Sequence, residues 1–455
     1  MAGSNTTGGT MRSRILAAAA GVALLSVACG NAGSSKASTT TLPASSGPGT
    51  TVSAADLQKN VPNSSPGVTD SEIKVAAITS KTGNPTGSYG ALVDGIKAYF
   101  EKVNDAGGIY GRKLVVAYDR DDQFAQNGQT VQASLSQDKA FATFIATTFF
   151  TPGAQKLASA NQPVFMWNIN AEFAGHPTFF ANDGALCFTC AGHGAPWLAK
   201  QVGATKVGLL AYGGAPQSAD CATGVKASFA KYPTGKVVFD DESIGFAQPL
   251  GPQVTKMKQE GVQFVLTCVD LQESFTLAKE MQKQGLKAAQ ELPQGYDQNF
   301  IKSNPQLNGA YVIPQFLAFE QTPQIPEIKD LFKYADKIGV KVSELTAVGW
   351  QIASELYQGL RGAGPEFTQA KVVDYLNTLT HYTDNGFIQP LDWTKGHIDP
   401  IKNPSARPAE ECANFVQVEN GKFVPRFGQP GKPWVCFGRD DPTVDNPTYK
   451  SFVGT

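Results

Sequence analysis

Apolar residues along the chain follow two alternating periods from about residue 72 onward. Short runs rich in Val, Ile, Leu and Phe, such as residues 73–78, have the composition and length of buried strands. Between these runs apolar residues recur at helical spacing, as at Leu92, Ile96 and Phe100. The expected strands cover residues 73–78, 114–118, 144–146, 164–167, 207–211, 237–239, 264–267 and 310–313.

Repeated strand–helix units of this kind predict parallel sheets covered by helices on both faces. These strands are more than one open sheet usually holds, so we expect an α/β protein with two Rossmann-like lobes. Further helical patterns cover residues 342–361 and 369–380. In the tail, Glu419-Asn420-Gly421 between residues 415–418 and 422–425 is a hairpin signal.

The distribution of charge along the chain argues against a nucleic-acid partner. The 455 residues carry a formal net charge of −1, and no block of like charges occurs. A surface that binds nucleic acid needs a basic stripe that neutralises phosphates. We therefore expect no nucleic-acid partner.

The N-terminus has the parts of an export signal. Arg12 and Arg14 precede an apolar run at residues 15–27, which is short for a membrane-spanning helix. We therefore expect residues 1–28 to be a signal peptide, and the protein to be exported.

Ser26-Val27-Ala28-Cys29 resembles the lipobox of bacterial lipoproteins. The resemblance implies a lipid on Cys29 that anchors the protein to the outer face of the cytoplasmic membrane. An ordinary cleaved signal with an incidental cysteine is the alternative. Residues 29–67 are built mainly from Ser, Thr, Gly, Ala and Pro, so we expect a flexible linker before a globular part that starts near Val68.

Six cysteines remain after Cys29. An even number in an exported chain indicates disulfides rather than free thiols. Cys412 and Cys436 bracket the hairpin and are expected to pair. The other expected pairs are Cys187 with Cys190 and Cys221 with Cys268, although other connectivities of these four stay open.

One stretch carries a resemblance to a known family. Residues 102–114 read Lys-Val-Asn-Asp-Ala-Gly-Gly-Ile-Tyr-Gly-Arg-Lys-Leu. Gly107 and Gly108 permit a left-handed turn after a helix, and Gly111 permits a second tight turn. The stretch resembles the periplasmic-binding-protein type I superfamily, in its leucine/isoleucine/valine-binding branch. Further stretches similar to that family are residues 68–75, 82–90, 206–210, 257–265, 309–312 and 347–361.

The resemblance implies two lobes joined by a three-crossing hinge, which close on a ligand without catalysis. It implies the solute-binding protein of an ABC importer, with the permease as partner and an amino acid or a related carboxylate or amide as ligand. A ligand-sensing receptor component of the same fold, not coupled to import, is the alternative. The expected N-terminal lobe is residues 68–188 and 312–385, and the C-terminal lobe is residues 189–311 and 386–455.

Ligands of parallel α/β sheets bind beyond the carboxyl ends of the strands. At one such end, residues 147–151, hydroxyl groups and the N–H groups of a helix start suit an anion, and simple N-capping by Thr151 is the alternative. The family binds a ligand carboxylate with Ser or Thr here, and usually has another Thr in the next loop. This chain has Asn168 and Asn170 there instead, so specificity for an α-amino acid stays open.

Aromatic and acidic residues complete the expected site. Aromatic walls provide contact area at a small entropic cost. Asp270 and Asp297 are the acids nearest the second-lobe mouth and suit an ammonium group, with helix capping as the alternative. The candidate ligand-binding residues are Tyr89, Thr147, Thr148, Phe149, Thr151, Trp167, Asn168, Asn170, Tyr212, Asp270, Tyr296 and Asp297.

Rival chemistries have weaker support. Cys187-x-x-Cys190-x-x-His193 resembles part of a metal site, but zinc needs a fourth ligand at suitable spacing, which no other histidine offers. The sequence contains no G-x-S-x-G, P-loop or H-E-x-x-H motif. We therefore expect no catalytic residues, no metal and no cofactor.

Overall fold

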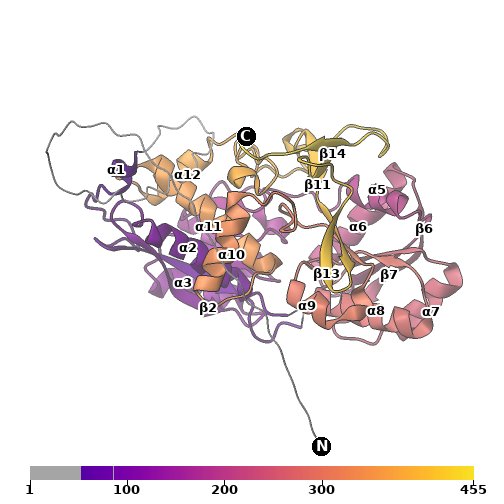
Figure 1. Cartoon of the computed structure of the whole chain (residues 1–455). Helices are drawn as coiled ribbons and strands as arrows, with labels where there is room; N and C mark the ends of the chain where they lie inside the picture. The colour runs from indigo at the N-terminus through magenta and orange to yellow at the C-terminus, as the bar shows by residue number, and fades with distance from the viewer. Residues whose placement is uncertain (1–52, 86) are drawn as a thin grey trace, which may run out of the picture. The chain divides into compact units, whose positions relative to one another are not determined.

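Two parallel sheets with flanking helices organise the chain in the computed structural model (Figure 1). The structure describes residues 53–85 and 87–455, which lie in one compact unit. The predicted signal peptide and the lipidation of Cys29 lie outside the described residues. No helix in the described part of the chain is long and apolar enough to cross a membrane.

The first sheet has five parallel strands in the order β2-β1-β3-β4-β5. The strands are β1 (Glu72–Thr79), β2 (Lys113–Asp121), β3 (Thr143–Ala146), β4 (Val164–Met166) and β5 (Phe179–Ala181). The helices between them are α2 (Ala91–Asp105), α3 (Asn127–Gln137) and α4 (Thr151–Ala160). The strand order reverses between β1 and β3, and a crevice opens at the carboxyl ends of strands where this happens.

The second sheet has four parallel strands in the order β7-β6-β8-β9. Its elements are α5 (Gly194–Gln201), β6 (Lys206–Tyr212), α6 (Pro216–Lys231), β7 (Lys236–Ile244), α7 (Gly251–Glu260), β8 (Phe264–Cys268), α8 (Leu271–Gln284), β9 (Ala289–Gln290) and α9 (Gln298–Ser303). Here the order reverses between β6 and β8. Each sheet with the helices packed on it is called a lobe below, the first and the second in chain order.

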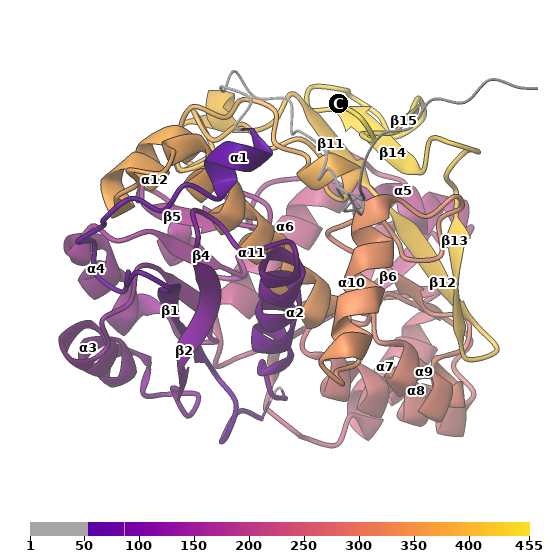
Figure 2. The same cartoon turned by 60° about the vertical axis from the view of Figure 1, so that its left-hand side comes forward.

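After β10 (Tyr311–Val312) the chain returns to the first lobe. It forms α10 (Pro326–Lys337), α11 (Glu344–Ala363) and α12 (Gln369–Leu376). Figure 2 shows α10 and α11 beside α2, and both helices contact it. A Cβ on Gly95 would lie 2.0 Å from the carbonyl oxygen of Thr346, and one on Gly349 would lie 1.9 Å from that of Leu92. Only glycine therefore permits the approach of α2 and α11.

The chain passes from one lobe to the other after β5, after β10 and after α12. These three crossings, with two parallel sheets, make the two-lobed α/β architecture that the sequence predicted, and the predicted fold class is confirmed. The sequence pattern did not indicate α10 or the short strands β5 and β9. A strand of two or three residues leaves no periodic signal.

The C-terminal tail adds antiparallel strands. Asn420 and Gly421 have φ values of 51° and 71°, which allow the tight turn of the predicted hairpin. The remaining elements are β11 (Glu410–Ala413), β12 (Phe415–Glu419), β13 (Lys422–Arg426), β14 (Trp434–Gly438) and β15 (Thr448–Lys450), with α1 (Ala54–Leu57) and 3-10 turns at Ala171–Phe173, Pro305–Leu307, Asp384–Gly386 and Pro404–Ala406. The hairpin β12–β13 pairs with β10.

The structure contains the three expected disulfides. Cys412–Cys436 joins β11 to β14 across the base of the hairpin. The other two are Cys187–Cys190 and Cys221–Cys268. His193, which follows the first of these, contacts Glu411 through Nδ1 at 3.1 Å and the carbonyl oxygen of Asp441 through Nε2 at 3.2 Å.

The glycine-rich family stretch is a structural turn. Gly107, Gly108 and Gly111 have φ values of 99°, 79° and 71°, as the sequence predicted. Arg112 is buried, and its guanidinium donates to the carbonyl oxygens of Thr69, Tyr110 and Val61.

The end of the expected linker is bound to the first lobe. Asn60 donates to the carbonyl oxygen of Asp70, and Asn63 donates to that of Phe367. Residues 60–63 are therefore held against the folded part, and the expectation of a flexible linker up to residue 67 is wrong for them. The polar composition predicted a loop, but it carried no information about these distant partners.

Lys102 allows a test of the packing between α2 and α10. Its ammonium group is buried and lies 2.9 Å from Glu327 and 3.1 Å from Asp330. Lys102→Ala leaves these carboxylates without their cation and is expected to lower the free energy of unfolding by about 3 kcal/mol. Lys337→Ala is the control, because Lys337 joins the same two helices through Glu101 and Asp105 but is largely exposed, and less than about 1 kcal/mol is expected. Urea unfolding measures both values, and equal losses would contradict the prediction.

Candidate ligand-binding site

A cavity of about 350 Å³ lies beyond the carboxyl ends of strands from both sheets. Its size and largely apolar wall are typical of small-molecule sites. The lining residues are Tyr89, Thr148, Trp167, Ile169, Phe188, Tyr212, Ala215, Gln217, Ser218, Cys221, Phe246, Thr267, Cys268, Val269, Asp270, Glu291, Pro293, Gln294, Ile313, Gln315 and Glu344. Of the predicted ligand-binding residues, Tyr89, Thr148, Trp167, Tyr212 and Asp270 line it.

Three of these residues form the first-lobe wall. The rings of Tyr89 and Trp167 meet edge to face, with centroids 5.3 Å apart. The Thr148 hydroxyl donates to the Tyr89 hydroxyl oxygen at 3.3 Å, and the Trp167 indole N–H donates to Gln315 Oε1 at 3.1 Å. The aromatic wall is therefore held by hydrogen bonds as well as by packing.

The second-lobe wall is built around Tyr212 and Asp270. Asp270 is the N-cap of α8 and accepts from the backbone N–H groups of Gln272 and Glu273. The Tyr212 hydroxyl donates to the same carboxylate, and burial beside it raises the pKa of Tyr212. The ring of Phe246 lies 4.4 Å from that of Tyr212.

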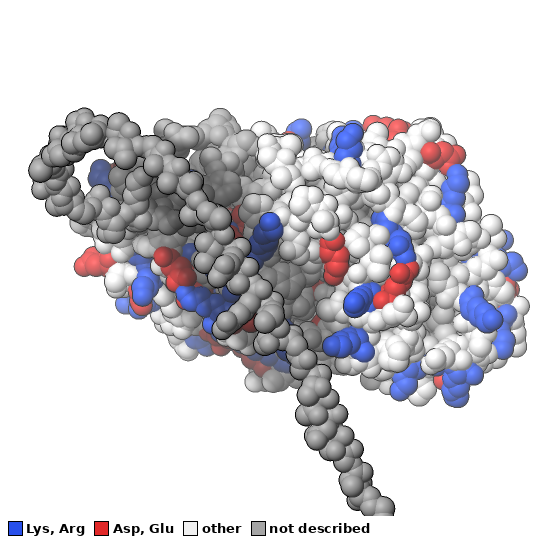
Figure 3. Space-filling view, viewed as in Figure 1, with Lys and Arg blue, Asp and Glu red and all other residues white. Residues whose placement is uncertain are grey.

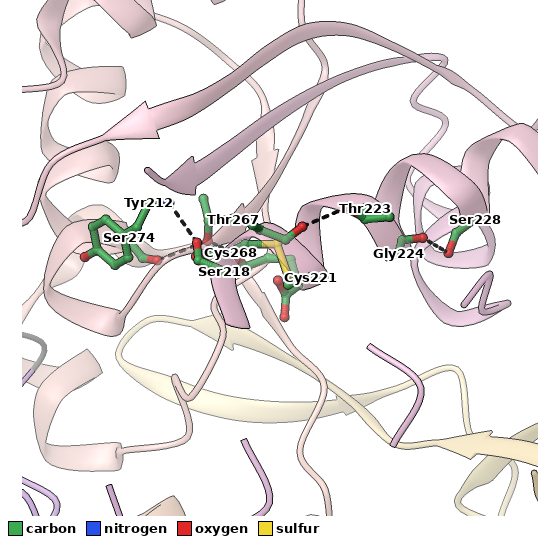
Figure 4. Close-up of a disulfide and its surroundings, with 11 residues drawn as sticks. Tyr212, Ser218, Cys221, Thr223, Gly224, Ser228, Thr267, Cys268 and Ser274 are labelled. Carbon is green, nitrogen blue, oxygen red and sulfur yellow. Dashed lines mark hydrogen bonds between the residues drawn. A yellow bond between two sulfur atoms is a disulfide. The ribbon is translucent and has the colours of Figure 1, made fainter. Parts of the chain in front are cut away.

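A disulfide forms part of this wall. Figure 4 shows Cys221 on α6 joined to Cys268 at the end of β8. Beside it, the Tyr212 backbone N–H donates to Ser218 Oγ at 2.7 Å, and Ser218 donates to the Cys268 carbonyl oxygen. The bond and these contacts tie α6 to the ends of β6 and β8, so this part of the wall is rigid.

The two lobes also contact each other beside the cavity. Gln217 of the second lobe donates to the Thr148 carbonyl oxygen of the first at 3.2 Å. The ring of Phe246 lies 6.0 Å from that of Phe124, which follows β2. The two lobes therefore touch beside the cavity in this conformation.

Three predicted residues support the loops instead of lining the cavity. Thr147 donates to Asp122 at 2.5 Å, and Ser80 donates to the same carboxylate at 2.7 Å, which joins the ends of β1, β2 and β3. Asn168 donates to the Gly184 carbonyl oxygen, and Asn170 donates to that of Thr147. These side chains fix where Thr148 and Trp167 lie.

Four other predicted residues also lie off this cavity. Thr151 is exposed, bonds to Glu172 and does not cap α4, whose N-cap position is Phe150. Phe149 packs on Phe124, with ring centroids 4.9 Å apart. The other two are Tyr296 and Asp297.

Tyr296 and Asp297 have structural partners. Tyr296 is 1 % exposed, so the expected place at an open mouth is wrong for it. Its hydroxyl bonds to Glu320 and accepts from the Phe319 backbone N–H at 2.7 Å. Asp297 is the N-cap of α9 and accepts from the N–H groups of Asn299 and Phe300.

Several lining residues were missed by sequence reasoning. Gln217 and Phe246 follow the carboxyl ends of β6 and β7, where ligands of parallel sheets are expected to bind. Their residue types, however, do not by themselves indicate binding. Glu344 begins a helix that is far along the chain from the other lining residues. Such residues are brought to one cavity only by the tertiary fold.

The carboxyl groups of the cavity are poorly compensated. Burial, with the nearby charge of Glu344, raises the pKa of Glu291 to about 8. Burial raises the pKa of Glu344 to about 7, although one of its oxygens accepts from the Tyr296 backbone N–H at 3.1 Å. Asp183, which is also close to Glu344, has its pKa raised by burial to about 7. No Lys, Arg or His is among the described residues that line the cavity.

The described residues contain no group of three or more His, Cys, Asp or Glu side chains arranged to hold a metal ion. The molecular surface differs from the cavity in charge. On the face shown in Figure 3, Lys and Arg side chains are interspersed with Asp and Glu. In the cavity wall, by contrast, the charged residues among those described are all acidic.

Comparison with known proteins defines the family to which this two-lobed chain belongs. A sequence profile described as periplasmic binding protein matches residues 72–422, so the chain belongs to the periplasmic binding protein family. A search of the curated proteins finds no sequence match.

Solved structures share the fold. A fatty acid ABC transporter substrate-binding protein from Thermomonospora curvata is similar with a TM-score of 0.65 and 19 % identity, over 80 % of this chain and 93 % of that one. The branched-chain amino acid transporter substrate-binding protein LivJ of Streptococcus pneumoniae, solved with isoleucine, has a TM-score of 0.62 and 16 % identity, over 78 % and 99 %. An ABC transporter solute-binding protein of R. palustris, solved with 4-hydroxybenzoate, has a TM-score of 0.60 and 18 % identity, over 78 % and 95 %.

The raised pKa values predict how stability depends on pH. The carboxyls of Glu291 and Glu344 bind protons more tightly in the folded protein than in the unfolded chain, so stability falls as pH rises toward their folded pKa values of about 8 and 7. Between about pH 6.5 and 8.5, Glu291→Gln should weaken this fall and stabilise the apo protein at the upper end by about 1 kcal/mol or more. Urea unfolding across that range, with the exposed Glu366→Gln as control, measures the effect. Identical slopes for wild type and Glu291→Gln would refute it.

Proposed function

We propose that this protein is an exported solute-binding protein of an ABC importer, which captures a small molecule in the cavity between its lobes. The observation that carries the proposal is a cavity lined from both lobes at the topological switch points of a two-lobed fold. Membership of the periplasmic binding protein family supports a binding role.

The moving parts that we propose are residues 68–188 with 312–385, and residues 189–311 with 386–455. Ligand that touches both walls stabilises the closed arrangement, because only there are both sets of contacts made. The Gln217–Thr148 hydrogen bond and the Phe124–Phe246 contact would form and break with each cycle. A cargo could then be released to a permease when the lobes separate.

The neighbours differ in ligand, since one is a substrate-binding protein of a fatty acid transporter and the other two were solved with isoleucine and with 4-hydroxybenzoate. The cavity of this chain combines aromatic rings with few polar groups. This supports a small ligand with an apolar body, and an amino acid or related amide is within its size.

A thermal-shift screen followed by scattering tests this function. A ligand at about a hundred times its Kd should add about 2.7 kcal/mol to stability and should compact the protein in small-angle scattering. Phe246→Ala should weaken binding by more than about 1 kcal/mol, because it removes part of the wall. Phe332→Ala, an exposed ring on α10, is the matched control and should bind as wild type does. Binding without compaction, with Phe246→Ala unimpaired, would argue against capture between lobes.

We also propose that Cys29 carries a lipid that holds the protein at the outer face of the cytoplasmic membrane. The lipobox-like sequence before it supports this anchor. Cys29→Ala should move the protein from the membrane fraction to the soluble fraction or the medium, with unchanged thermal unfolding of the released protein. Retention of the variant in the membrane fraction would rule out the anchor.

A further inference from the structure

The hydrogen-bond donors that line the cavity are mostly used by the protein itself. Thr148 donates to Tyr89, Trp167 to Gln315 and Tyr212 to Asp270. Ser218 donates to the Cys268 carbonyl oxygen. A ligand carboxylate would therefore find few free donors on this wall.

The carboxylate acceptors of the cavity, in contrast, have few hydrogen-bond partners in the protein. The Glu291 carboxylate has no hydrogen bond or ion pair from any described residue, although it lines the cavity. Glu344 accepts one hydrogen bond, from the Tyr296 backbone N–H to Oε2, and its other oxygen has no partner in the described part of the chain. Unpaired carboxylate oxygens are costly unless a donor or a cation reaches them.

The charge of the cavity wall also favours a ligand with a positive charge. Three carboxyl groups line the cavity, those of Asp270, Glu291 and Glu344, and no described lining residue is basic. Asp270 is satisfied by the start of α8 and by Tyr212. The side-chain amides of Gln217, Gln294 and Gln315 suit a carbonyl or hydroxyl group but cannot neutralise an anion.

The aromatic part of the wall suits the rest of such a ligand. Tyr89, Trp167, Phe188 and Phe246 line the cavity and offer ring surface for an apolar body, and ring faces attract cations. We propose that the cavity binds an organic amine, with its ammonium group at Glu291 and Glu344 and its apolar body against the aromatic rings. This inference rests on the proposed binding function and specifies its ligand class.

The ionisation of the cavity carboxyl groups should make amine binding depend on pH. The facing groups are Glu344 at the start of α11, Asp270 and Tyr212 on the second lobe and Tyr89 on the first, with Asp183 close to Glu344. Without a cation, Glu291 and Glu344 hold protons near neutral pH, with pKa values of about 8 and 7. A bound ammonium favours their charged forms, so amine binding should release protons and strengthen from about pH 6 to pH 8.

The test uses ligands matched in shape and different in charge. Isobutyl, phenyl and indole frames are each supplied as an amine, a carboxylate, an alcohol and an amino acid, and calorimetry at about pH 8 measures each affinity. In at least one frame the amine should bind about tenfold or more tightly than its carboxylate and alcohol counterparts. Two buffers with different ionisation enthalpies should reveal proton release for the amine.

Matched variants locate the charge. Glu291→Gln and Glu344→Gln should each weaken binding of that amine about tenfold or more, whereas the exposed Glu366→Gln should not change it. A carboxylate, alcohol or amino acid as the tightest ligand, amine binding that both Gln variants leave intact, or no amine binding up to about 10 mM would overturn the inference.

The two proposals fail differently. A non-amine that binds and compacts the protein would refute the ligand class and leave the binding function standing. If no compound of the broad screen binds or compacts the protein, the binding function itself is wrong.

Discussion

The close packing of α11 on α2 is the constraint on which the rest of the site depends. It needs glycine at positions 95 and 349, because a Cβ there would lie about 2 Å from a facing carbonyl oxygen. The contact returns the chain to the first lobe after it has built the second. It thereby sets the first turn of α11, with Glu344, at the cavity between strands that precede it by more than fifty residues in the chain.

The walls of the cavity are cross-linked by covalent and hydrogen bonds, but two of its carboxyl groups have few hydrogen-bond partners. The second-lobe wall is held by the Cys221–Cys268 disulfide and by the contacts of Ser218, and the first-lobe loops are joined through Asp122. The Glu291 carboxylate has no hydrogen-bond partner among the described residues, and that of Glu344 has one, the Tyr296 backbone N–H. Binding sites commonly give up stability in this way, because groups that complement a ligand are poorly satisfied without it.

The same arrangement bears on the proposed closure of the lobes on a ligand. Beside the cavity the described residues of the two lobes meet through hydrogen bonds from Gln217 to Thr148 and from the Tyr296 backbone N–H to Glu344. The rings of Phe124 and Phe246 also make contact there. A ligand that touches both walls adds its own contacts to these and so favours the arrangement in which the lobes meet. In the tail, the hairpin β12–β13 extends the pairing of β10, and the Cys412–Cys436 disulfide joins the neighbouring strands β11 and β14.

The sequence by itself indicated the fold class, the hairpin and the Cys412–Cys436 pair that brackets it, because each has a local signal. It suggested the pairing of the other four cysteines but left other connectivities open, and the structure decided between them. Alternating periods mark strands and helices, Asn-Gly marks a tight turn, and the glycines at 107, 108 and 111 mark left-handed turns. It also placed Tyr89, Thr148, Trp167, Tyr212 and Asp270 at the site, because parallel strands end at one edge.

Only the tertiary structure decided which neighbours of these residues face the cavity. Thr147 and Thr148 are adjacent and alike, yet one turns to Asp122 and the other to the cavity wall. Tyr296 looks like a mouth residue in the sequence but is enclosed by Phe316, Phe319 and Phe423. Glu291 and Glu344 carry no local signal, since the residues that line the cavity with them lie far apart in the sequence. Side-chain direction and the balance of donors and acceptors are properties of the packed fold, and no short stretch of sequence contains them.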